Sequence, residues 1–136
     1  MQASGTFTVE AFSPVDPHMD TGPVTATSVA VMRMEKQFTG DVAGRSVTVF
    51  TYALDAATDV GGYVAMESFE GVLGGRPGTF NFSHSATTVG DVRSDESLVI
   101  IPSSGTEELT GISGGGGIAV DADGTHRIWF DYKLPA

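Results

Sequence analysis

The segment ESFEGVLGGRPGTFNFSHS, residues 67–85, decides the fold, because its side chains alternate in character beyond a glycine-rich turn. In a β-strand, residues two apart share one face. After the turn GGRPG (74–78), this period puts Phe80, Phe82 and His84 on one face and small polar residues on the other. The segment therefore predicts a strand whose inner face is aromatic and carries an imidazole.

The segment before the turn, GYVAMESFEG (62–71), alternates in the same way. Tyr63, Glu67 and Phe69 share a face with an alanine, and the two aromatic rings favour placing that face inside. Glu67 is then expected to be buried among aromatic side chains.

The last strand-like segment, HRIWFDYKL (126–134), adds a third inner face. Here Phe130 and Tyr132 fall in step with Ile128 and Leu134, whereas charged residues occupy most of the alternate positions. We expect Phe130 and Tyr132 to point inward.

The rest of the chain is typical of an all-β protein. It has 136 residues with 18 glycines and 8 phenylalanines, and almost no stretch shows helical periodicity. Strand-like segments separated by turn residues predict one domain, residues 1–136, with strands at 5–13, 24–38, 41–54, 61–71, 78–87, 92–102, 109–121 and 125–134.

Antiparallel strands of this number form either a closed eight-stranded barrel or a two-sheet β-sandwich. Several of the segments exceed about ten residues, which favours the barrel, because long strands in sandwiches usually break at bulges. The interior of such a barrel is filled by side chains or holds one small ligand. SGGGG (113–117) is interpreted as a bulge or close-packed corner, with a mobile loop as the alternative.

Charge and composition exclude several classes of protein. The net charge is −10 with 7 Lys and Arg, which disfavours nucleic acid and anionic membranes as partners. There is no cysteine, so thiolate catalysis and cysteine-bound metals are excluded. The N-terminus has no secretory signal pattern and no apolar run approaches membrane-spanning length, which predicts a cytoplasmic protein.

Glu67 and His84 are the candidate catalytic residues. Burial raises the pKa of a carboxyl group and lowers that of an imidazole, unless the two pair and favour both charged forms. Perturbed groups of this kind serve as acids and bases, and phenols stabilise a developing oxyanion. The alternative is that both residues are satisfied structural groups of the core.

No metal or other cofactor is expected. The loop PVDPHMDTGP (14–23) presents Asp16, His18 and Asp20 at alternating positions, a set that could bind a metal ion. An ordinary solvated turn of prolines and acids explains the same residues, and we favour that interpretation.

Four segments resemble a bacterial family known as a domain of unknown function. They are KQFTGDVAG (36–44), YVAMESFEGVLGGRPGTFNFSH (63–84), IPSSGTEELTGISGGGG (101–117) and FDYKL (130–134), in order over nearly the whole chain. The resemblance implies a β-barrel like that of the allene oxide cyclases. Related barrels include dirigent-like proteins and natural-product cyclases, and they form dimers or trimers. The resemblance therefore implies that this chain can also form a homo-oligomer, either a dimer or a trimer.

The resemblance and the inner faces together predict a cofactor-independent cyclase or isomerase that holds a hydrophobic small molecule in the barrel. A cavity that selects one folded conformer lowers the entropic barrier to ring closure. Glu67 would be the acid/base and His84 its partner, Tyr63 and Tyr132 would donate hydrogen bonds to a substrate oxygen, and the cavity would be shaped by Phe69, Phe80, Phe82 and Phe130. One alternative is a lipocalin-like carrier without turnover, and another is a filled barrel that acts through its surface or as an oligomer.

Overall fold

The computed structural model describes residues 1–16 and 19–136, which contain eight β-strands and one short 3-10 helix. Helix η1 (Glu107–Leu109) lies between β6 and β7. The strands are β1 (Gln2–Pro14), β2 (Val29–Gly40), β3 (Val42–Asp55), β4 (Val60–Leu73), β5 (Arg76–Val89), β6 (Val92–Ile100), β7 (Ser113–Val120) and β8 (His126–Lys133).

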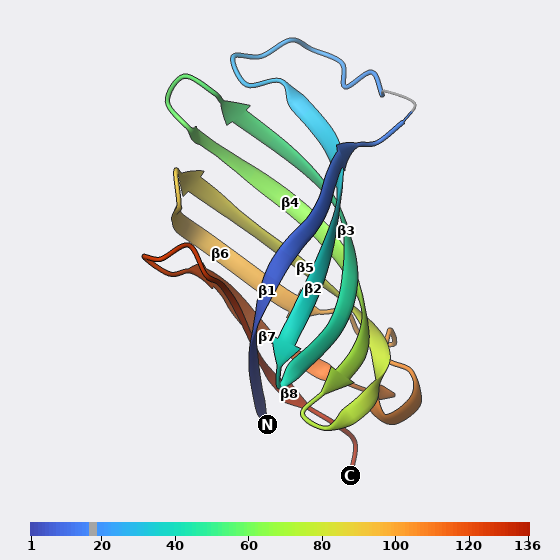
Figure 1. The fold of residues 1–136 in the computed structure, drawn as a ribbon. Coiled ribbons are helices and arrows are strands. Elements are labelled where there is room, and N and C mark those ends of the chain that lie inside the picture. The colour runs from blue at the N-terminus through green and yellow to red at the C-terminus, as the bar shows by residue number, and fades with distance from the viewer. Residues whose placement is uncertain (17–18) are drawn as a thin grey trace.

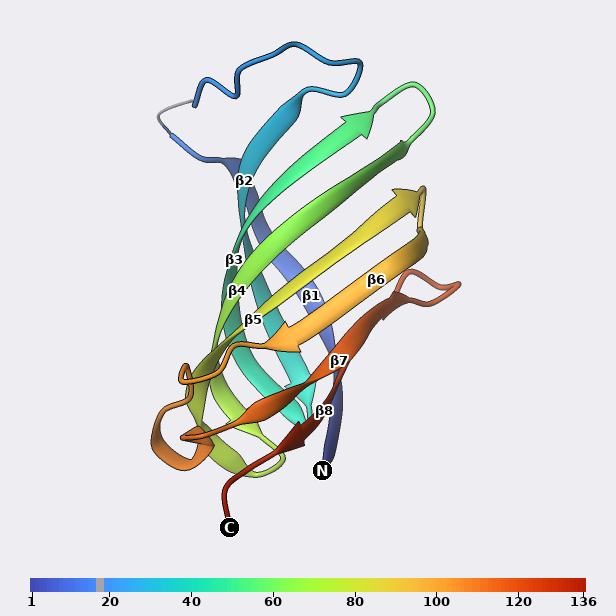
Figure 2. The same ribbon diagram turned by 180° about the vertical axis from the view of Figure 1, so that it is seen from behind.

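The strands form a ring in their sequence order (Figure 1). Each strand is antiparallel to the strands before and after it, and β8 returns to pair with β1, which closes the barrel. The predicted all-β fold with eight antiparallel strands is confirmed. This up-and-down order brings the β1–β2, β3–β4, β5–β6 and β7–β8 connections to one rim of the barrel, which slopes from the top of Figure 1 down its left side and from the top of Figure 2 down its right side.

Pairing is continuous around most of the ring but weak at one seam. β4 and β5 pair without a break from Val60 opposite Val89 to Leu73 opposite Arg76. Between β6 and β7, the described part of the chain has a single backbone pair, which joins Val99 to Gly115. The barrel is therefore closed least firmly between these two strands.

The predicted strand 24–38 begins too early, because β2 starts only at Val29. Residues 24–28 are irregular, and the hydroxyl of Thr25 donates to the carbonyl oxygen of Thr27 at 2.8 Å. A threonine that bonds to nearby backbone offers the chain an alternative to a sheet ladder.

The predicted strand 109–121 is wrong in its first part. Helix η1 and a turn occupy residues 107–111, and β7 starts at Ser113. Leu109 and Ile112 are 0% and 1% exposed, so the segment folds inward and covers the end of the barrel opposite the β1–β2 connection. Burial of these two apolar side chains stabilises the turn by about 1.5–3 kcal/mol each.

The glycine run 113–117 lies within β7, so the mobile-loop alternative is wrong. A Cβ atom at Gly117 would fall into the indole ring of Trp129 on β8, and one at Gly116 would meet the Trp129 carbonyl oxygen. The absence of side chains in the run lets the backbone of β7 lie close to Trp129 of β8.

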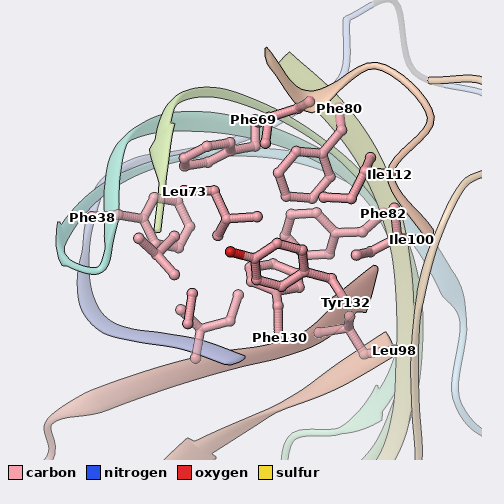
Figure 3. Packing of buried hydrophobic residues seen from close by; sticks show 14 of the residues in the cluster. Phe38, Phe69, Leu73, Phe80, Phe82, Leu98, Ile100, Ile112, Phe130 and Tyr132 are labelled. Atoms are coloured by element: carbon pink, nitrogen blue, oxygen red, sulfur yellow. The ribbon is translucent and has the colours of Figure 1, made fainter. Parts of the chain in front are cut away.

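One half of the interior is a packed hydrophobic core (Figure 3). Several of its aromatic rings meet edge to face, as between Phe82 and Phe130, whose centroids lie 5.2 Å apart. Each fully buried Phe stabilises the fold by about 1.5–3 kcal/mol through the hydrophobic effect. The core comprises Ala3, Phe7, Phe38, Val42, Phe69, Leu73, Phe80, Phe82, Leu98, Ile100, Leu109, Ile112, Ile118, Ile128, Phe130 and Tyr132.

Candidate functional site

The other half of the interior holds a cavity of about 240 Å³. Its wall is mainly apolar and includes polar groups from β2 to β6. The barrel is therefore filled at one end and hollow at the other. The cavity is lined by Phe7, Val9, Met34, Lys36, Thr48, Phe50, Tyr63, Ala65, His84, Thr88, Gly90, Asp91, Arg93, Ile118, Val120 and His126.

A polar layer centred on Glu67 lies between the core and the cavity. Glu67 Oε1 accepts from Lys36 Nζ at 2.9 Å and lies 2.8 Å from His84 Nε2, and Oε2 accepts from Ser46 Oγ at 2.5 Å. The four side chains come from β2, β3, β4 and β5 and are all buried. Strand alternation explains the layer, since every member occupies an inward position of its strand.

Glu67 is ionised in spite of complete burial. Burial raises the pKa of its carboxyl group, but the charge of Lys36 and the hydrogen bond from His84 outweigh that effect and lower the pKa to about 2. The sequence left open whether burial would raise the pKa of Glu67 or pairing would lower it. The pairing interactions together have the larger effect on this pKa.

His84 is held in one tautomer by its two neighbours. Burial lowers the pKa of the imidazole, and the hydrogen bond to Glu67 opposes this only in part, so the ring is neutral at pH 7. An ionised Glu67 can only accept, which places the imidazole proton on Nε2 and leaves Nδ1 as an acceptor. Nδ1 lies 2.8 Å from the hydroxyl oxygen of Tyr63, which therefore donates to it.

Tyr63 links this layer to Arg93 on β6. Arg93 Nη2 donates to the Tyr63 hydroxyl oxygen at 2.7 Å, and Arg93 Nε also donates to Glu96 at 2.8 Å. Burial raises the pKa of the Tyr63 phenol, while Arg93 lowers it to a smaller extent, so the phenol is protonated at rest. A carboxylate, an imidazole and a phenol thus form a chain of hydrogen bonds that ends at the cavity wall.

Thr48 is the exception to this complete hydrogen bonding. Its side chain is 2% exposed, it lines the cavity, and within the described residues its Oγ1 makes no hydrogen bond. Leaving a buried hydroxyl without a partner costs about 1–3 kcal/mol.

The predicted site residues fall into two groups. Tyr63 and His84 line the cavity, and Glu67 lies directly behind His84. The remaining predicted residues are Phe69, Phe80, Phe82, Phe130 and Tyr132. We expected them to shape the cavity, but they lie in the packed core and do not line it. Continuing each inward face along its strand gave no indication of where the packing would stop.

The other polar residues of the cavity were not predicted from the sequence; they are Lys36, Thr48, Thr88, Asp91, Arg93 and His126. Lys36 had a signal in the sequence, since it is two residues beyond the apolar Met34 and therefore shares its strand face. Thr48 and Arg93 had no such signal, because an inward threonine is common in strands and Arg93 lies at the beginning of its strand.

The alternative metal site in the 14–23 loop involves His18, which lies outside the described residues. Among residues 1–16 and 19–136, no cluster of three or more His, Asp or Glu side chains is placed to bind a metal ion. No helix in these residues has both the length and the hydropathy needed to cross a membrane.

Comparisons with known proteins agree on one family. Residues 3–132 match the model of a family described as protein of unknown function (DUF3224). A crystal structure of a protein with unknown function from the DUF3224 family of Shewanella oneidensis MR-1 is 30% identical, with a TM-score of 0.84 over 100% of this chain and 98% of that chain. A search of curated proteins found no match. The likeness to allene oxide cyclases stays a prediction.

Proposed function

The chain belongs to the DUF3224 family, and from its cavity we propose that it isomerises or cyclises a small, mostly apolar molecule by moving a proton within it. The observation that carries this proposal is the His84 imidazole, held between the Glu67 carboxylate and the Tyr63 phenol at the cavity wall. The expected mechanism is modified in one respect: the group that contacts the substrate is Tyr63, with His84 as its base and Glu67 as the residue that positions His84.

The proposed step begins with a neutral Tyr63 and a neutral His84. The Tyr63 oxygen takes a proton from the substrate while its own proton passes to His84 Nδ1, 2.8 Å away. The resulting imidazolium is stabilised by ionised Glu67 at 2.8 Å. A nucleophile or base that is activated by a positioned neighbour in this way is a general device of enzymes.

The second half of the step returns the proton to a different atom of the substrate by the same route. One bond of the substrate migrates, or a ring closes, and nothing is consumed. All the groups that move the proton belong to the chain itself, so the reaction needs no co-reactant. Arg93, at 2.7 Å from the Tyr63 oxygen, stabilises any negative charge that develops on that oxygen.

A carrier without turnover is the second candidate. Lys36, Ser46 and His84 all bond to Glu67, so the charges beneath the cavity neutralise one another. A largely apolar wall above a neutral floor suits the binding of an apolar molecule without reaction.

The experiment is native mass spectrometry of the protein purified from its own host, followed by release and identification of any bound molecule. The released molecule is then incubated with the wild type, Tyr63→Phe and Tyr52→Phe. Tyr52 is a half-buried tyrosine of β3 that does not line the cavity, which makes it a matched control.

Loss of a positioned acid or base typically lowers a rate by about 100-fold or more. We expect that loss of conversion in Tyr63→Phe, with binding kept, and no loss in Tyr52→Phe. Binding without conversion by the wild type would support the carrier. A protein that releases nothing and binds no apolar molecule would contradict both.

A further inference from the structure

The unpartnered hydroxyl of Thr48 indicates which class of molecule the cavity takes. We propose that Thr48 and Lys36 together bind a carbonyl oxygen, so that the ligand is an uncharged carbonyl compound with an apolar body. This inference rests on the proposed function to the extent that a small molecule occupies the cavity.

Thr48 is placed by the register of three strands. On β3 it lies opposite Met34 of β2 and opposite Glu67 of β4, and its side chain points inward. The neighbouring side chain of Met34 offers no strong donor or acceptor, and both oxygens of Glu67 are bonded to other residues. Thr48 Oγ1 makes no hydrogen bond within the described residues, so a ligand oxygen in the cavity would be its hydrogen-bond partner.

Lys36 adds a second donor beside it. Lys36 is opposite Ser46, two residues before Thr48, so Lys36 and Thr48 are diagonal neighbours on β2 and β3. The ammonium group has three N–H donors. One bonds to Glu67 Oε1, and the Nζ atom also lies 4.7 Å from the centroid of the Phe7 ring. A remaining donor is available to the cavity, which Lys36 lines. Two donors from adjacent strands fit one acceptor oxygen.

The charges around the cavity favour a neutral acceptor over a carboxylate. Lys36 is already paired with Glu67, and Arg93 with Glu96. Among the described residues that line the cavity, no lysine or arginine is left unpaired, so a carboxylate ligand would add a negative charge near Asp91 without such a cation to balance it. A carbonyl oxygen takes both hydrogen bonds without that cost.

The arrangement also fits the proposed proton transfer. Donors at a carbonyl oxygen acidify the C–H bonds beside it, and Ala65, whose side chain is small, lines the cavity between Tyr63 and Glu67 on β4. When the C–H bond breaks, its electron pair forms an enolate whose oxygen is held by Thr48 and Lys36, and the proton goes to Tyr63. Where the carbonyl compound also carries a carbon–carbon double bond next to that carbon, the enolate extends over the double bond, and return of the proton to its far carbon completes an isomerisation.

Three probes with the same phenylethyl body test the proposal: 4-phenylbutan-2-one, its hydrocarbon analogue butylbenzene, and the anion 3-phenylpropanoate. Dissociation constants are measured by NMR titration of the ¹⁵N-labelled protein at pH 7.5. We expect the ketone to bind at least about tenfold more tightly than either analogue, as expected for one or two good hydrogen bonds.

The variant Thr48→Val removes the hydroxyl and keeps the shape of the side chain. We expect its preference for the ketone over butylbenzene to fall by several-fold, to what the Lys36 hydrogen bond alone supplies, with the affinity for butylbenzene unchanged. Thr88→Val is the matched control, because Thr88 also lines the cavity but is only partly buried. It should keep the preference for the ketone.

A thermal melt of the free variants supplies a readout that does not depend on the probes. Removing an unpartnered buried hydroxyl should raise the Tm of Thr48→Val by at least about 2 °C, whereas Thr88→Val should not raise it. A lower Tm for Thr48→Val would show that the hydroxyl is satisfied within the protein, and would overturn the subsite.

The remaining outcomes separate the subsite from the proposed function. Equal binding of the three probes, tighter binding of 3-phenylpropanoate, or an unchanged ketone preference in Thr48→Val would overturn the carbonyl subsite while leaving a small-molecule cavity in place. Failure of all three probes to bind would overturn the subsite, and the native mass spectrometry described above would then decide separately whether any small molecule occupies the cavity.

Discussion

Lys36 and His84, on strands β2 and β5, contact the same carboxylate oxygen, Oε1 of Glu67, at 2.9 and 2.8 Å. This shared oxygen joins strands from two parts of the ring, and it explains how a fully buried carboxylate stays ionised. Glu67 and its partners also separate the packed hydrophobic core from the cavity.

Glu67 should make the protein sensitive to acid. The pKa of its carboxyl group falls from 4.5 to about 2 in the folded protein, so the unfolded chain binds more protons between these values. The stabilisation is complete above pH 4.5 and is lost as the pH falls toward 2, by about 3 kcal/mol in all. Urea unfolding between pH 7 and 2.5 measures it. Glu67→Gln should lack this loss, and Glu70→Gln, an exposed carboxylate of β4, should retain it. The same loss in Glu67→Gln as in the wild type would contradict the prediction.

His84 should titrate below 6.5 and stay neutral at pH 7. Burial lowers the pKa of its imidazole, so its contribution to stability is present above pH 6.5 and is lost as the pH falls below that value. Two-dimensional ¹H–¹⁵N NMR of the imidazole should show the proton on Nε2. In Glu67→Gln the pKa should fall further, because the carboxylate that raises it is gone. A titration midpoint above 6.5 would exclude this arrangement.

Lys36 and Glu67 should be strongly coupled. Glu67→Gln leaves a buried ammonium group without its counterion, which typically costs about 3–5 kcal/mol. Adding Lys36→Met removes that unpaired charge, so we expect the double variant to be more stable than Glu67→Gln alone. A double-mutant cycle from urea unfolding gives the coupling, expected to exceed about 1 kcal/mol. Additive single effects would show that the two residues act independently.

Phe82 and Phe50 should respond differently to truncation. Phe82 is 0% exposed in the packed core, and Phe82→Ala should cost about 3–5 kcal/mol without changing the affinity for 4-phenylbutan-2-one. Phe50 lines the cavity and is only partly buried, so Phe50→Ala should destabilise the protein less but change that affinity. If Phe82→Ala alters binding more than Phe50→Ala does, the assignment of the two halves is wrong.

Alternation along the strands predicted much of the molecule and failed at identifiable places. It correctly placed Tyr63, Glu67 and His84 inside, because the phase of a strand is local in the sequence. It could not tell that Phe82 packs tightly while His84, two residues later, meets a cavity. That boundary depends on side-chain volumes contributed by all the strands together.

The missed residues show the same limit. Lys36 was placed on no inner face because a lysine is normally solvated, although its strand phase matches that of Met34. Its burial depends on Glu67, which lies 31 positions further along the chain. The Lys36–Glu67 ion pair can be predicted only when the register of β2 and of β4 against β3 is known.

The seam between β6 and β7 has a single backbone pair among the described residues, so it is the place where the ring would widen most easily. A groove of about 170 Å³ at this seam is lined by residues of both strands, including Gly116 and Gly117, and it reaches His84 and Arg93. Backbone amides beside Val99 and Gly115 should therefore exchange hydrogen faster than those of the β4–β5 ladder, as measured by mass spectrometry. Separation of β6 from β7 would leave the backbone pairing between the other neighbouring strands in place. An opening there would admit a wider molecule from the side, so the size of ligand that the barrel takes would depend on the strength of this seam as well as on the volume enclosed at rest.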